Sequence, residues 1–301
     1  MPTSPPKMRP DELDIDAELV RRLVAEQFPQ WAELPVRLVR SAGTDNAMYR
    51  LGDELVVRLP RLPGGEGQIL REHRWLPRLA PHLPLSVPVP LAVGEPGAGF
   101  ALPWGVYRWL EGSNDLVELA DAAVELGRFV AALHKVDASG GPPSYRGAPP
   151  GGNDSYVRQA IRDFGSHGTI DPALATEVWE RTLRLPDWDG APVWLHGDLL
   201  PGNLLAVDGR LTSVIDFGCL GVGDPAVDLM AAWTVLTAGT REAFRAAADV
   251  DDATWERGRG WALCFGLMAE HYYGDAFGNG MNPVLAGVGR RAVAEALAEC
   301  A

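Results

Sequence analysis

The spacing of apolar residues divides the chain near residue 110. Apolar positions three and four residues apart predict a helix over residues 67–80, with Glu72 on its apolar side. A preceding helix is expected to begin near Asp14 or Asp16. Short apolar runs bounded by glycine, proline and polar residues predict five strands in this part of the chain, over residues 36–41, 47–51, 54–59, 91–94 and 101–109.

Helical spacing dominates the rest of the chain. A strand at 193–195 and a hairpin formed by 204–207 and 211–215 are the expected interruptions. The loop at 138–152 is rich in glycine and proline, and we expect it to be a surface connection. Helical stretches are predicted from Leu116 onward, around Leu126, Val157, Val178, 227–236, 261–268 and 284–297.

These patterns predict an α+β fold with two lobes. A small five-stranded antiparallel N-lobe with one packed helix, residues 13–109, precedes a larger, mainly helical C-lobe, residues 110–301. Residues 1–12 are predicted to be a disordered tail, because the first ten residues include four prolines and lack an apolar run.

A run of polar residues carries the most specific chemical signal. His196-Gly197-Asp198 is followed by Asn203 and then by Asp216-Phe217-Gly218. Phosphoryl transfer needs a carboxylate to orient and deprotonate the attacking hydroxyl, and oxygen ligands for magnesium on the nucleotide phosphates. Asp198 suits the first role, whereas Asn203 and Asp216 suit the second. Asp-Phe-Gly alone is weak evidence, because an acid before an aromatic residue and a glycine is usually a strand end followed by a turn.

His196 has two interpretations. A histidine beside an acid can act as a general base. Since Asp198 already occupies that position, we expect His196 to hold the loop backbone by hydrogen bonds instead.

The stretch from Trp194 to Leu229 resembles the aminoglycoside phosphotransferase family of small-molecule kinases. The resemblance implies a bilobal protein-kinase-like fold, Mg2+ as cofactor and ATP or GTP as co-substrate. It also implies that Asp228 braces the catalytic loop through its backbone amides, and that Asp224 belongs to a second acidic motif near the acceptor. The alternative for Asp224 is an N-cap with Pro225 at the first helical position.

The N-lobe is then expected to bind the nucleotide. Arg58 stands where a strand lysine commonly holds the phosphates, and Glu72 would position it. The alternative is an exposed arginine paired with any acid. Further candidates are Ser41, Gly43 and Thr44 in a flap that equally suits a plain hairpin turn, and Tyr107 and Trp109 near the base, which are otherwise ordinary strand aromatics.

Charge and composition narrow the partners. The net charge is −13: residues 1–109 hold 13 basic and 13 acidic residues, and residues 110–301 hold 14 and 27. Nucleic acid is therefore an unsuitable partner. The acidic C-lobe suits a cationic acceptor, or it merely keeps the protein soluble. Glu270 and Tyr273 could line the acceptor pocket with Asp224, or could belong to a solvated helix end.

The remaining features concern location. No segment has the length of uncharged apolar sequence that a membrane span needs, and the first residues do not resemble a signal peptide. Three scattered cysteines argue against a disulfide framework or a zinc site. We therefore expect a cytoplasmic protein without a membrane partner.

The function predicted from these features is transfer of the γ-phosphoryl group of a nucleoside triphosphate to a hydroxyl of a small molecule, with an aminoglycoside-like or other cationic antibiotic as the expected acceptor. A metabolite kinase of the choline, homoserine or sugar type is one alternative. A nucleotide-binding regulator without catalysis is the other, motivated by Arg58 and the glycine-poor flap. The sequence does not predict an oligomeric state.

Overall fold

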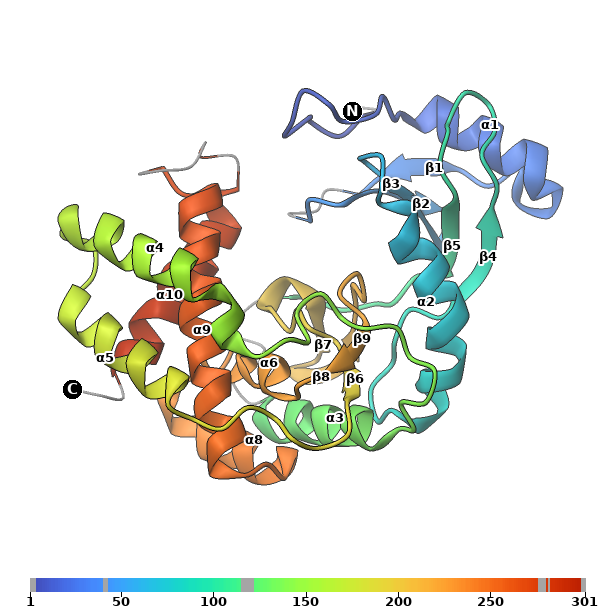
Figure 1. The fold of residues 1–301 in the computed structure, drawn as a ribbon. Helices are drawn as coiled ribbons and strands as arrows, with labels where there is room; N and C mark the ends of the chain where they lie inside the picture. The colour runs from blue at the N-terminus through green and yellow to red at the C-terminus, as the bar shows by residue number, and fades with distance from the viewer. Residues whose placement is uncertain (1–3, 40–42, 115–121, 276–279, 281, 299–301) are drawn as a thin grey trace. The chain divides into compact units, whose positions relative to one another are not determined.

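A computed structural model describes residues 4–39, 43–114, 122–275, 280 and 282–298 (Figure 1). The chain forms two compact units. Unit 1 comprises residues 1–81 and 86–111, and unit 2 comprises residues 82–85 and 112–301. Each unit has its own core.

Unit 1 is built on a five-stranded antiparallel sheet with the strand order β1-β2-β3-β5-β4. This confirms the predicted sheet. Its described strands and helices are β1 (Val36–Leu38), β2 (Asn46–Leu51), β3 (Leu55–Pro60), β4 (Pro90–Gly94), β5 (Trp104–Arg108), α1 (Ala17–Gln27) and α2 (Glu66–Leu79).

Helix α1 covers one face of this sheet. Asp16 caps the helix, because its carboxylate accepts the backbone N–H of Leu19 at 2.7 Å. Residues alternate between the two faces along each strand, so one set of strand side chains faces α1. The core that results includes Leu19, Val20, Leu23 and Val24 of the helix and Tyr49, Leu51, Val57, Leu59 and Val106 of the strands.

Helix α2 lies against the other face. Ile69, Glu72, Leu76 and Leu79 are buried, as their spacing predicts. Arg58 lies between Val57 and Leu59, which face α1, so its side chain points to the opposite face of the sheet. There it meets Glu72 of α2. The burial of a charged pair between helix and sheet explains why a glutamate interrupts an apolar stripe.

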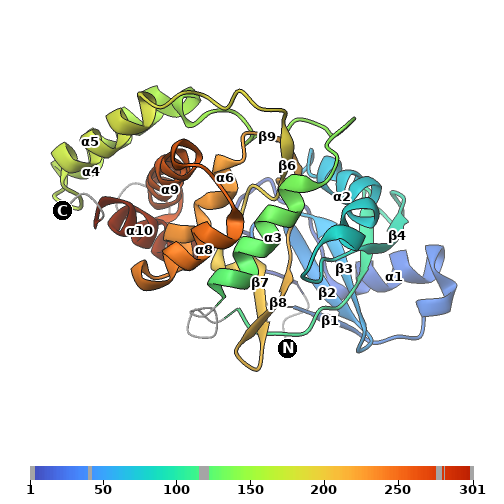
Figure 2. The ribbon, with the colours of Figure 1, turned by 90° about the horizontal axis from the view of Figure 1, so that it is seen from below.

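Unit 2 combines helices with two small antiparallel sheets. Strand β6 (Val193–Leu195) pairs with β9 (Gly221–Gly223), and β7 (Leu204–Val207) pairs with β8 (Arg210–Val214). Helix α3 packs along α8, and α9 packs along α10 (Figure 2). The described helices are α3 (Ala123–Lys135), α4 (Asp154–Ser166), α5 (Pro172–Leu183), α6 (Ala226–Leu229), α7 (Ala231–Thr234), α8 (Arg241–Ala248), α9 (Asp252–Tyr273) and α10 (Pro283–Ala298).

Two features of unit 2 differ from the sequence expectations. Strand β9 was not predicted, because three residues containing two glycines give no strand pattern. The loop at 138–152 is not only a surface connection. Pro143 forms a parallel bridge with Val222, and Ser144 is 7% exposed. No helix within the described part of the chain is long and apolar enough to cross a membrane.

The segment before α1 also contributes to unit 1. Glu12 is buried and its Oε2 accepts the Nε–H of Arg61 at 2.8 Å, while Oε1 accepts the backbone N–H groups of Met8 and Arg9 at 3.0 and 3.1 Å. The side chain of Arg61 is only 4% exposed. At Glu12, therefore, the structure has a buried ion pair where the sequence predicts a disordered tail.

Glu12→Ala leaves the guanidinium of Arg61 buried without its carboxylate, so we expect the free energy of unfolding of unit 1 to fall by about 3 kcal/mol. Urea unfolding of the full chain, followed by tryptophan fluorescence, measures the change. The control is Glu18→Ala, which removes an exposed pair with Arg21 and should change stability by less than about 1 kcal/mol. Equal effects of the two substitutions would contradict the importance of the buried pair.

Candidate active site

A buried carboxylate holds the loop that follows β6. Asp228 of α6 is fully buried, and its Oδ2 and Oδ1 accept the backbone N–H groups of His196 and Gly197 at 3.1 and 2.6 Å. His134 of α3 places Nε2 3.2 Å from Oδ2. Gly197 has φ 78°, a conformation that favours glycine. Asp228 thus contacts the backbone amides that the family resemblance implies it would brace.

The imidazole of His196 joins this loop to the backbone before Asp216. Its Nδ1 accepts the backbone N–H of Asp198 at 3.2 Å, so Nε2 carries the proton and donates it to the carbonyl of Ile215 at 3.0 Å. The ring also meets Phe217, with centroids 4.5 Å apart. Both ring nitrogens are thus bound to backbone groups, which supports a structural role for His196.

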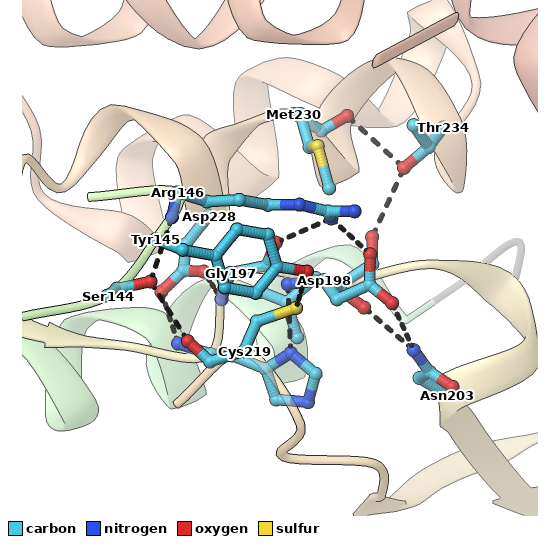
Figure 3. Close-up of polar contacts among 12 residues, drawn as sticks. Ser144, Tyr145, Arg146, Gly197, Asp198, Asn203, Cys219, Asp228, Met230 and Thr234 are labelled. Atoms are coloured by element: carbon cyan, nitrogen blue, oxygen red, sulfur yellow. Dashed lines mark hydrogen bonds and ion pairs between the residues drawn. The ribbon is translucent and has the colours of Figure 1, made fainter. Parts of the chain in front are cut away.

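The carboxylate of Asp198 is contacted from two sides (Figure 3). Its Oδ1 forms an ion pair with Arg146, which also donates to the carbonyl of Gly197 at 2.9 Å. Its Oδ2 lies 3.2 Å from Nδ2 of Asn203, and the same nitrogen donates to the Asp198 carbonyl at 2.9 Å. The side chain of Asp198 is 21% exposed. The carboxylate is therefore both oriented and accessible.

The β7–β8 hairpin brings Asp216 close to Asn203. Asn203 comes directly before β7, and its carbonyl accepts the backbone N–H of Ile215 at 2.8 Å. Asp216 follows with φ 62°, in the left-handed region that aspartate and asparagine adopt more readily than most residues. The amide and the second acid of the motif thus come from adjacent ends of one hairpin.

These two residues fit a magnesium ion that is shared with a nucleotide. Among the described residues, no group of three or more His, Cys, Asp and Glu side chains could hold a metal. Magnesium, however, usually combines one or two protein oxygens with phosphates and water. Because Nδ2 of Asn203 is bound to Asp198, its Oδ1 is turned away from Asp198 (Figure 3). The carboxylate of Asp216 and this amide oxygen are suitable hard ligands.

Arg146 is a site residue that sequence reasoning missed. It lies in the loop predicted to be a surface connection, and nothing in its own sequence context distinguishes it. The sequence signal that could have marked this loop as part of the site is its glycines. A Cβ at Gly147 would lie 2.8 Å from the carbonyl oxygen of Val222, and one at Gly141 would lie 2.5 Å from the Val222 side chain. Glycine is needed here because the loop packs directly on β9.

Other contacts tie this loop to the residues after Asp216. The hydroxyl of Ser144 donates to the carbonyl of Cys219 at 2.9 Å, and the hydroxyl of Tyr145 lies 2.9 Å from the Cys219 Sγ. Burial raises the pKa of the Cys219 thiol to about 12, so it remains protonated at neutral pH. Cys219 is thus a packed thiol and not a nucleophile.

Unit 1 contains a second polar cluster. Nη1 of Arg58 lies 3.0 Å from both carboxylate oxygens of Glu72, and the hydroxyl of Tyr107 donates to Oε2 at 2.6 Å. The guanidinium carbon lies 5.3 Å from the centroid of the Tyr107 ring. All three side chains are buried. The structure therefore joins Arg58 and Glu72 as expected, and it places Tyr107 with them.

The other nucleotide-side candidates lie apart from this cluster. The hydroxyl of Thr44 donates to Asp45 at 3.0 Å, and Gly43 precedes it, whereas Ser41 lies outside the described residues. The ring of Trp109 lies under the guanidinium of Arg50, 4.0 Å from its centroid. The flap and base-pocket roles of these residues stay predictions.

The acceptor-side candidates occupy different environments. Asp224 is buried and binds Arg257 at 3.0 and 3.2 Å, and its Oδ1 accepts the backbone N–H of Ala226 at the start of α6. These contacts favour the structural interpretation of Asp224. Glu270 pairs with Arg290 at 2.8 Å. Tyr273 packs edge-to-face against Tyr272, with centroids 4.8 Å apart.

Two proteins of known sequence match parts of the chain. The uncharacterized protein YcbJ of Bacillus subtilis (strain 168) is 29% identical over 200 residues, which cover 63% of this chain and 59% of YcbJ. An aminoglycoside 3'-phosphotransferase of Escherichia coli is 40% identical over 62 residues, covering 21% of this chain and 23% of that protein. The matches thus span less than two thirds of either relative.

Solved structures match over nearly the whole chain. The GDP complex of aminoglycoside 2'-phosphotransferase-IIIa aligns with a TM-score of 0.69 at 18% identity, covering 95% of this chain and 100% of that one. Macrolide 2'-phosphotransferase MphH from Brachybacterium faecium aligns with a TM-score of 0.59 at 25% identity, covering 90% and 97%. These likenesses confirm the protein-kinase-like fold. Residues 36–261 match the family described as Phosphotransferase enzyme family, and the chain belongs to that family.

Proposed function

We propose that the protein transfers the γ-phosphoryl group of ATP or GTP to a hydroxyl of a small molecule. The observation that carries this proposal is the arrangement around Asp198. Its carboxylate is oriented by Asn203 and accessible to solvent, and the hairpin places Asp216 beside Asn203. This set supplies a proton acceptor and two magnesium ligands, which a phosphotransferase needs.

In the proposed mechanism, Asp198 orients the acceptor hydroxyl and takes its proton as the oxygen attacks the γ-phosphorus. Asn203 keeps the carboxylate in place through Nδ2. Magnesium, held by Asp216 and the Asn203 amide oxygen together with nucleotide phosphates, would neutralise the charge of the transferring group. His196 and Asp228 keep the loop rigid, which limits reorganisation during the reaction.

For unit 1, we propose that Arg58 contacts the nucleotide phosphates and that Glu72 fixes its guanidinium. Arginine retains the positive charge of the more common lysine and can bind phosphate with two N–H groups. Tyr107 donates to the same carboxylate, so Glu72 receives hydrogen bonds from both partners. The flap residues Gly43 and Thr44 would contribute backbone or hydroxyl donors.

The acceptor is the larger unknown. The matching solved structures include phosphotransferases named for aminoglycosides and for macrolides, and the net charge of residues 110–301 attracts cations. We therefore propose an antibiotic-like acceptor with at least one hydroxyl, cationic as a whole. Kanamycin, gentamicin, a macrolide, choline, homoserine and a hexose form the first screen, read by acceptor-dependent nucleotide consumption. Nucleotide binding without consumption under any acceptor would favour a regulator.

Asp198→Asn keeps the size of the side chain but removes the proton acceptor. We expect turnover to fall by roughly 10²-fold to 10⁴-fold while nucleotide affinity changes little, because the group acts in the transition state. Steady-state kinetics and nucleotide titration provide the two measurements. The matched control is Asp208→Asn in the β7–β8 turn, which should leave turnover unchanged. Near-normal turnover of Asp198→Asn would refute the assignment.

Asp216→Asn should weaken magnesium-dependent nucleotide binding more than Asn203→Ala, because hard cations favour a carboxylate over an amide oxygen. Asparagine is chosen since it tolerates the positive φ at position 216. Nucleotide affinity with magnesium and with EDTA gives the comparison. A larger loss for Asn203→Ala would contradict this order of importance.

Arg58→Ala and Glu72→Ala should be strongly non-additive in nucleotide affinity, because each removes the same phosphate-positioning unit. Arg58→Lys should retain part of the affinity. Nucleotide titration of both single variants and the double variant tests this, with melting temperatures as a check on folding. Losses that simply add would show that the two side chains act separately.

A further inference from the structure

Arg146 places a guanidinium beside Asp198, the proposed proton acceptor. Nη1 of Arg146 donates both to Asp198 and to the carbonyl of Gly197. A guanidinium has five N–H groups, so Nε and Nη2 keep three more. Within the described residues these three have no protein acceptor, and the Arg146 side chain is 22% exposed. Arg146 therefore presents hydrogen-bond donors to whatever approaches Asp198.

The position of Arg146 indicates which reactant it faces. It contacts Oδ1 of Asp198, whereas Asn203 contacts Oδ2, and the two side chains lie on opposite sides of the carboxylate (Figure 3). Asn203 is on the side of the candidate magnesium ligands and hence of the nucleotide phosphates. The opposite side is the one left for the acceptor.

Two aromatic rings keep the guanidinium in this place. Its carbon lies 5.5 Å from the ring centroid of Tyr145 and 5.8 Å from that of Phe265 in α9. Contacts of this kind restrict the guanidinium without using its N–H donors. The donors are thus oriented before any ligand binds.

We infer that Arg146 is an acceptor-recognition residue, and that the acceptor carries a hydrogen-bond-accepting oxygen, best a carboxylate, next to the hydroxyl that is phosphorylated. This inference rests on the proposed function. A guanidinium binds such oxygens with two N–H groups, and it repels an ammonium group at the same distance. A cationic acceptor remains compatible with the acidic unit only if its amines lie away from the reacting hydroxyl.

A binding experiment tests this without turnover. The probes are 3-hydroxypropanoate and 3-amino-1-propanol, which differ in the charged group beside one hydroxyl. Each is titrated into the full chain, labelled with 15N-arginine and saturated with magnesium and a non-hydrolysable ATP analogue. The Nε–H resonance of Arg146, assigned by its loss in Arg146→Lys, should shift saturably with the hydroxy acid and not with the amine.

Three results of the titration would overturn the inference. These are an equal response to both probes, no response to either, and a response that the nucleotide alone saturates. The last would mean that Arg146 binds the γ-phosphoryl group instead of the acceptor.

Turnover gives a second, independent test. The substrates are hydroxyl compounds tested in pairs, one member with a carboxylate and the other with an ammonium group beside the hydroxyl. Arg146→Gln should lower the ratio of kcat/KM for the carboxylate member to kcat/KM for the ammonium member by roughly tenfold or more, and Arg146→Lys should lower this ratio less. The control Arg158→Gln removes another ion-paired arginine of unit 2 and should leave the preference unchanged. An equal loss for both members of each pair would contradict acceptor recognition.

The two measurements separate the proposals. A selective shift of the Arg146 resonance without acceptor-dependent nucleotide consumption would refute the kinase function and leave the recognition of the oxygen group intact. Acceptor-dependent nucleotide consumption with an unchanged carboxylate preference in Arg146→Gln would support the kinase function and refute acceptor recognition by Arg146.

Discussion

The geometry of the candidate active site in unit 2 depends on one buried carboxylate. Asp228 accepts the backbone N–H groups of His196 and Gly197, so two donors that would otherwise be buried without partners are satisfied together. His196 extends the constraint, because its two nitrogens bind the backbone at Asp198 and at Ile215. The loop after β6, the β7–β8 hairpin and α6 thus form one hydrogen-bonded assembly. This assembly sets the direction of the Asp198 side chain.

Much of the fold and of the candidate site could be predicted from the sequence, because the spacing of residues along the chain determines them. Strand alternation and helical periodicity identified the five-stranded sheet and placed Glu72 on a buried helix face. Motif spacing identified Asp198, Asn203 and Asp216 as residues that come together, because a short loop and a two-residue turn leave the chain few alternatives. The family resemblance added the bracing by Asp228, which spacing alone does not show.

The features that were missed depend on contacts between distant segments. Arg146 reaches Asp198 across 52 residues of sequence, and Glu12 reaches Arg61 across 49. An arginine in a glycine- and proline-rich loop has no periodic pattern that would mark it. Strand β9 likewise forms only because β6 and the loop at 138–152 lie on either side of it. Tyr107 was expected near the nucleotide base, but its hydroxyl turns toward Glu72 because residues alternate along β5.

The packing of the loop at 138–152 on β9 has a consequence for how this protein could diversify. Close glycine contacts, the hydroxyl of Ser144 and backbone hydrogen bonds to β9 hold the path of the loop, and the side chains of Tyr145 and Arg146 add contacts to Cys219 and Gly197. Exchange of those two side chains would therefore leave the backbone contacts and the Ser144 hydrogen bond in place. A protein built this way can acquire a new preference among ligands through one or two substitutions, with little change in the scaffold that supports catalysis.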